Sequence, residues 1–111
     1  MKKHLMIIGA LLAATPAEAR VVTNDGNELL DVCTQTDYFS QGYCLGYIRA
    51  LSDGMDMILA MDNKQVCYGE NVTIGQIRDV VIDYVKRNPA KRNQNAMVLV
   101  SWALAEAWPC Q

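Results

Sequence analysis

The sequence GYCLGYIRALSDG, residues 42–54, predicts the helix around which the rest of the chain is organised. Apolar residues recur there at intervals of four and three, the spacing of an amphipathic helix: Cys44, Ile48, Leu51, Met55 and Ile58. Beside this seam lies a row of small residues at every fourth position, which we call the glycine row: Gly42, Gly46, Ala50 and Gly54. A row without bulky side chains lets a second helix approach closely. Because each interior glycine costs about 1 kcal/mol relative to alanine, we expect this to be a tightly packed core helix.

The first 19 residues have the pattern of a secretory signal peptide. A charged start (Lys2, Lys3) precedes an apolar run from Leu5 to Ala14, and Ala17-Glu18-Ala19 matches a cleavage site. The run is too short to remain as a membrane span, so we expect cleavage after Ala19 and no membrane partner afterwards. Residues 20–111 then form one exported domain, which in a bacterium means a periplasmic protein. The chain carries a formal net charge of −2 and no basic stripe, which argues against nucleic acid as a partner.

The cysteine and histidine content restricts the chemistry. Four cysteines, Cys33, Cys44, Cys67 and Cys110, are typical of two disulfides in a small exported domain. The single histidine, His4, leaves with the signal peptide, which removes histidine metal sites and histidine-based acid–base catalysis. We therefore predict no catalytic residues, no metal and no cofactor.

Capping signals divide the remaining chain into four helices, so we predict an all-α, small four-helix bundle-like domain stapled by two disulfides. Asp25 with Glu28 three residues later predicts the first helix start, and Thr73 with Gln76 forms a capping box for the third. Pro89 ends the third helix at about Asn88. The predicted helices reach from the cap at Asp25 to Cys33, from about Tyr38 to Met61, from Thr73 to about Asn88, and from about Gln94 to Trp108.

This layout favours one disulfide pairing over the other two connectivities. Cys33 ends the first helix and Cys44 lies about two turns into the antiparallel second helix. Cys67 precedes the third helix and Cys110 follows the fourth, where antiparallel neighbours bring their ends together. We favour Cys33–Cys44 and Cys67–Cys110.

One further feature predicts a self-association surface, and another offers an alternative function as an enzyme. The last helix is apolar nearly all round, and Val98, Leu99, Trp102 and Leu104 cannot all face one small core, so we expect self-association through it. Asp79 and Asp83 share a helix face and could serve an enzyme. Charged residues nearby screen them and favour an ordinary solvated face: Arg78, Lys86 and Arg87.

Four pieces in fixed order resemble the Rap/Tai family of type VI secretion immunity proteins. They are CLGYIRALSDG at 44–54, Cys67, VTIGQI at 72–77 and ALAEAWPC at 103–110. The resemblance covers most of Asp31 to Cys110, and the ending WPC is its most specific part. Tyr68-Gly69-Glu70 stands where the family usually has a proline soon after the third cysteine, a departure confined to a loop.

The resemblance implies a function and a site. Family members are periplasmic helical dimers that protect a bacterium from peptidoglycan-cleaving amidases of the NlpC type, plugging the amidase cleft with an inter-helix segment. The matching segment here is 88–95, and the partner-binding residues implied are Asn88, Lys91, Arg92 and Asn93. The resemblance thus predicts a non-enzymatic homodimer that occludes a cognate amidase effector. The alternative is a periplasmic holdase similar to the small helical acid-stress chaperones, without a toxin partner.

Overall fold

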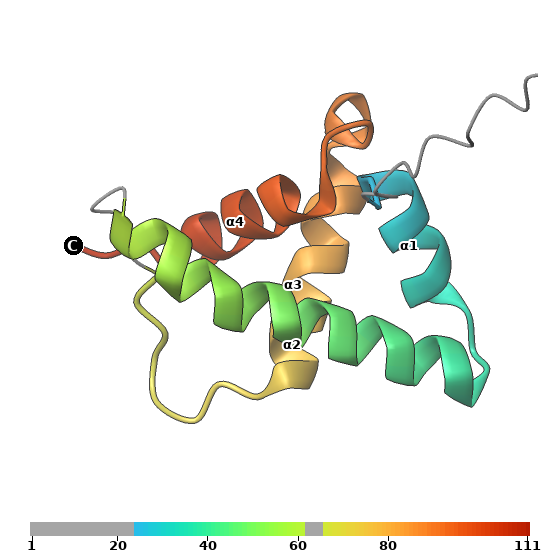
Figure 1. Ribbon diagram of the computed structural model, residues 1–111, viewed down its shortest axis with the longest axis horizontal. Helices are drawn as coiled ribbons and strands as arrows, with labels where there is room; N and C mark the ends of the chain where they lie inside the picture. Colours follow the sequence, from blue (N-terminus) through green and yellow to red (C-terminus); the bar gives the residue numbers. More distant parts are fainter. Residues whose placement is uncertain (1–23, 62–65) are drawn as a thin grey trace, which may run out of the picture.

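The computed structural model of the chain describes residues 24–61 and 66–111. These residues form four α-helices and one 3-10 turn, which confirms the predicted all-α class (Figure 1). The only extended pairings within the described ranges are two isolated bridges, Asp25 with Asn95 and Val66 with Pro109. The predicted signal peptide lies outside the described residues. In chain order the elements are α1 (Gly26–Thr34), α2 (Tyr38–Met61), α3 (Ile74–Arg87), η1 (Pro89–Lys91) and α4 (Ala96–Ala107).

Each α-helix begins where a short polar side chain accepts a hydrogen bond from a backbone N–H of its first turn, which satisfies a donor that has no partner inside the helix. The caps predicted for the first and third helices, Asp25 and Thr73, are confirmed. The fourth helix begins two residues later than predicted, because the Asn95 side chain caps it. The cap residues and their N–H donors are Asp25 with Glu28, Asp37 with Ser40, Thr73 with Gln76, and Asn95 with Met97.

One hydrophobic core lies between the four helices, with α4 in contact with all three others. Because α4 is surrounded in this way, Leu99 and Leu104 are both fully buried and Val98 is half-buried. Trp102 is exposed, so the four residues do not all face one core, as expected, and self-association through this helix stays a prediction. The buried apolar set is Leu29, Cys33, Cys44, Ile48, Met55, Ile77, Val81, Tyr84, Val85, Ala96, Leu99, Val100, Ala103 and Leu104.

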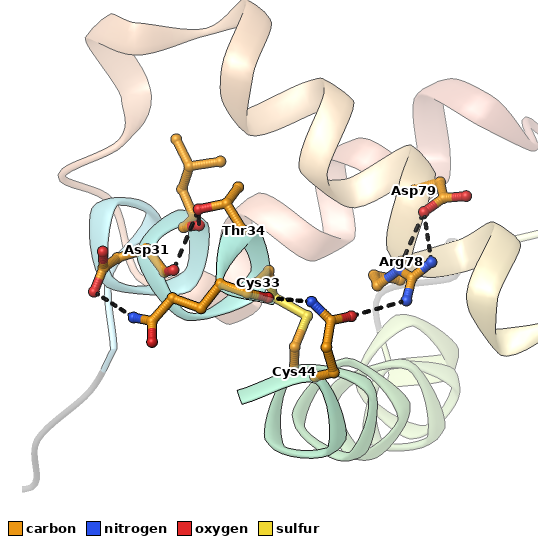
Figure 2. The surroundings of a disulfide bond; sticks show 9 residues. Asp31, Cys33, Thr34, Cys44, Arg78 and Asp79 are labelled. Carbon is orange, nitrogen blue, oxygen red and sulfur yellow. Dashed lines mark hydrogen bonds and ion pairs between the residues drawn. A yellow bond between two sulfur atoms is a disulfide. The ribbon is translucent and has the colours of Figure 1, made fainter. Parts of the chain in front are cut away.

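Both predicted disulfides are present. Cys33–Cys44 joins the end of α1 to the second turn of α2, and Cys67–Cys110 ties the segment before α3 to the chain after α4, each with Cα atoms 5.1 Å apart. Figure 2 shows the first bridge, with Arg78 and Asp79 of α3 beside it. The Gln41 side chain connects this corner, donating to the carbonyl of Gln35 and accepting from Arg78.

The predicted core role of the glycine row was wrong. Gly42, Gly46 and Ala50 are exposed and Gly54 is half-buried. No described atom outside the helix lies within 4 Å of a Cβ built on any of the three glycines. The apolar seam (Cys44, Ile48, Met55) does enter the core, as predicted. At 100° per residue, Gly46 points about 200° away from Ile48, so burying the seam turns the glycine row outward.

Candidate functional site

The segment 88–95, which we call the inter-helix loop, stands out from the body of the molecule beyond the end of α3 (Figure 1). Pro89 ends α3 because its ring cannot continue the helical hydrogen bonds. Asn88 closes that end by donating to the Tyr84 carbonyl twice, from its backbone N–H at 3.1 Å and its side-chain amide at 2.8 Å. Asn88 is therefore a helix cap, and its amide group is already engaged.

Arg92 fastens the loop to α3 from the other side. Its guanidinium donates to the backbone carbonyls of Val85 and Lys86, at 2.9 Å each. These are among the last carbonyls of the helix, which have no partner within it and carry the negative end of its dipole. The half-buried Arg92 side chain thus supports the loop.

The loop backbone is also joined to the start of α1. The N–H of Gly26 donates to the Gln94 carbonyl and the N–H of Asn27 to the Arg92 carbonyl, both at 3.2 Å. The Ala96 N–H donates to the Asn24 carbonyl at 2.8 Å. With α3 on one side and α1 on the other, the loop has a fixed conformation before any partner arrives.

Lys91 lies between two aromatic rings. Its ammonium nitrogen is 5.7 Å from the ring centre of Tyr84, 5.4 Å from that of Trp102, and 3.3 Å from the Tyr84 hydroxyl. A cation over an aromatic face is attracted to the ring at these distances. The Trp102 side chain is 42 % exposed, so Lys91 and Trp102 form one continuous surface beside the loop.

The tip itself is open. Pro89, Ala90 and Asn93 are exposed, and the Asn93 side chain makes no hydrogen bond to the described residues. Of the four sequence-predicted residues, Lys91 and Asn93 thus present groups to solvent, while Asn88 and Arg92 hold the loop in shape. Sequence reasoning missed the pairing of Trp102 with Lys91, because it depends on how α4 packs against α3.

The acidic face of α3 is occupied by ion pairs. Arg78 contacts Asp79 at 3.0 Å, while Arg87 contacts Asp83 at 2.7 Å and Glu106 of α4 at 3.2 Å. Hydrogen bonds to Asp83 and then Glu106 raise the pKa of the Arg87 guanidinium.

An open hollow of about 510 Å³ borders this face of α3, lined in part by Arg78, Asp79 and Asp83. Within the described ranges, no cluster of three or more His, Cys, Asp or Glu side chains could hold a metal. The ion pairs of Asp79 and Asp83 support the interpretation of this side of α3 as an ordinary solvated helix face.

Together the fold and the loop define a small, disulfide-bonded, all-α protein whose most prominent feature is a fixed, exposed inter-helix loop. The chain belongs to the Rap1a immunity proteins, since the model of that family matches residues 25–110. It is therefore an immunity protein, a class whose partner is an effector protein, and the predicted family is confirmed. Searches of curated proteins and of solved structures each found no match. None of the described helices combines the length and apolarity that crossing a membrane requires.

Proposed function

We propose that this immunity protein acts in the periplasm, where it binds a type VI secretion peptidoglycan amidase and occludes its active-site cleft without doing chemistry. The observation that carries the proposal is the inter-helix loop, which is fixed at both ends and open at its tip. Family membership supports a secreted effector as the partner. The two disulfides fit an oxidising compartment, consistent with the signal peptide expected at residues 1–19.

A fixed loop suits occlusion for an energetic reason. Ordering a flexible segment on binding costs about 0.5–1.5 kcal/mol for each immobilised side chain. Here the hydrogen bonds of Arg92 and of the α1 N–H groups already hold the loop, so most of that cost is met on folding. Tight, stoichiometric inhibition is the expected behaviour.

The loop tip alone is too small for a stable complex, since a standard interface covers about 800 Å² on each partner. We infer that the contact extends from Asn93 over the exposed surface of Lys91 and Trp102. Tryptophan is among the residues that most often contribute strongly at interfaces. Asn93 would then enter the cleft while Trp102 packs against its rim.

The test is periplasmic co-expression with the cognate amidase, using a substitution that blocks the tip without touching its supports. Asn93→Arg adds bulk and charge to an exposed side chain, and surface changes of this kind cost within about 0.5 kcal/mol of stability. We expect protection to be lost, inhibition of the purified amidase to weaken by at least about tenfold, or 1.4 kcal/mol, and the melting temperature to stay unchanged.

Glu70→Arg is the matched control, because Glu70 is exposed in the loop before α3, well away from the inter-helix loop in sequence. It should protect as well as the wild type. If Asn93→Arg protects fully, the proposed function still stands, but the contact with the amidase lies on another surface. Cells that lyse equally with and without the wild-type protein would rule out immunity against that amidase.

We further infer that the protein acts as a homodimer, as the family resemblance implies. The last helix is a poor candidate for the interface, because Leu99 and Leu104 lie in the core of the single chain and Trp102 lies beside the loop.

A further inference from the structure

Helix α1 is held in the molecule mainly at its two ends. Only three of its nine residues are buried, and they are Gly26, Leu29 and Cys33. Gly26 has no side chain and Cys33 belongs to the Cys33–Cys44 disulfide, so Leu29 is the one large apolar side chain that α1 buries completely. Helices shorter than about 12 residues are marginal in water on their own. The disulfide is therefore a large part of what keeps α1 in place.

The start of α1 forms one side of the inter-helix loop. Three backbone hydrogen bonds join the two segments, from the N–H groups of Gly26, Asn27 and Ala96 to the carbonyls of Gln94, Arg92 and Asn24. The packing is close, because a Cβ added to Gly26 would lie 2.9 Å from the Arg92 carbonyl oxygen. If α1 moves away, the loop loses these three bonds and keeps those that it makes with α3.

The helix itself connects the disulfide to the loop. Figure 1 shows α1 running from beside the inter-helix loop toward the first turns of α2, where Cys44 lies. Over its nine residues α1 spans about 13 Å. We propose, on the basis of the function proposed above, that the Cys33–Cys44 disulfide positions the inter-helix loop by holding α1. Cys33 and Cys44 are then positioning residues for occlusion of the amidase.

Loss of this bond affects the loop before it affects the rest of the fold. Stability is not uniform across a structure, so α1 detaches in a local opening while α3 and α4 stay folded. A loop that has lost one side samples several conformations, and only some of them fit the amidase cleft. The apparent affinity then falls in proportion to the fraction of molecules that keep the loop in place.

The second disulfide offers a matched comparison, because it lies away from the loop. Cys67–Cys110 follows the end of α4, whose 12 residues separate it from the loop by about 18 Å. Figure 1 shows the C-terminus on the opposite side of the molecule from α1. This bond closes a sequence separation of 43 residues, against 11 for Cys33–Cys44, so its loss releases more chain entropy. Cys33 and Cys44 are buried, and their loss also removes packing. We expect the two bonds to contribute similarly to stability and differently to the loop.

Two double variants make the comparison, each keeping the other disulfide. They are the α1 variant, Cys33→Ala/Cys44→Ala, and the control variant, Cys67→Ala/Cys110→Ala. If either melts near the assay temperature, Gly46→Ala is added to every protein. Alanine is the better helix former, and Gly46 has open space at its Cβ, so this change restores stability without touching α1 or the loop.

Hydrogen exchange tests the positioning without any effector. The quantity measured is the protection of the Ala96 N–H divided by that of the Val81 N–H, which lies in the buried part of α3. A uniform loss of stability does not lower this ratio. It should fall at least about tenfold in the α1 variant, through local opening, and should not fall in the control variant. An unchanged ratio in the α1 variant, or an equal fall in both variants, would overturn the proposal.

Inhibition of the purified amidase tests whether this positioning matters for occlusion. The α1 variant should inhibit at least about tenfold more weakly than the wild type, and the control variant should stay within about threefold. Equal weakening by the two variants would show that stability alone is responsible, against the proposal. If the wild type does not inhibit the amidase, the proposed function fails, and the exchange ratio alone decides whether the disulfide positions the loop.

Discussion

Two glycines in helices should respond to alanine in opposite directions, because one is exposed and the other is enclosed. A Cβ added to Gly46 meets no described atom outside its helix within 4 Å. A Cβ added to Gly26, at the start of α1, would collide with the Leu99 side chain and lie 2.9 Å from the Arg92 carbonyl oxygen and 3.1 Å from the Arg92 Cα. Backbone atoms of Arg92 cannot move aside as a flexible side-chain end does.

The magnitudes follow from helix propensity and from overpacking. Gly46→Ala gains about 0.8–1 kcal/mol, because alanine loses less backbone entropy in a helix interior. Gly26→Ala gains less propensity, since it stands in the first turn, and costs about 1–3 kcal/mol from overpacking. At about 4–8 °C per kcal/mol for a domain of this size, Gly46→Ala should raise the melting temperature by about 5 °C. Gly26→Ala should lower it by a similar amount or more.

The assay is thermal unfolding followed by circular dichroism in oxidising buffer. Protein concentration is kept low, so that any change in self-association does not contribute. Gly42→Ala is a second exposed-site control, since it also has open space at its Cβ. If Gly46→Ala melts below the wild type, the glycine row is packed against another element, and the assignment of the outer face of α2 is wrong. If Gly26→Ala melts no lower, the contact between α1 and the inter-helix loop is looser than described.

Three other perturbations test the disulfides, the loop support and a helix cap. Complete reduction, including that of Cys67–Cys110, removes loop-closure constraints of about 3 and 4 kcal/mol. Because the total stability of a domain is about 5–15 kcal/mol, we expect a large fall in the melting temperature, and an unchanged melting temperature would contradict this. Arg92→Ala should lower the melting temperature through the loss of about 1–2 kcal/mol of hydrogen bonding to carbonyls of α3, whereas Lys86→Ala, an exposed neighbour, should not. The Ser40 N–H holds the pKa of Asp37 below its ordinary 3.8, so Asp37 stabilises the fold above that pH and loses this effect as pH falls through the lowered value. Asp37→Asn keeps a capping oxygen but cannot titrate, so it should flatten the acid side of the stability profile; an identical profile would show that ionisation of Asp37 does not contribute.

The elements that sequence analysis predicted correctly are those set by local interactions. Asp25 and Thr73 cap helices because their side chains reach an N–H three residues away, whatever the rest of the fold does. The bounds of α2 follow from the same local rules, and both disulfides follow from where the helix ends fall in sequence. Family membership also follows from sequence, since the matched glycine, cysteine and WPC positions are recognisable without coordinates.

Tertiary packing alone decided which side of α2 faces outward and which loop residues are free. Small residues such as Gly46 suit both a close helix contact and an exposed face, so their spacing does not distinguish the two. The seam that contains Ile48 has more apolar area than the glycine row, so burying the seam is more favourable. Because the glycine row lies on the opposite side of the helix, Gly46 then faces solvent. The family resemblance implies that Arg92 binds the partner, because it lies in the segment 88–95. Only the end of α3, with unpaired carbonyls within its reach, shows that Arg92 supports the loop.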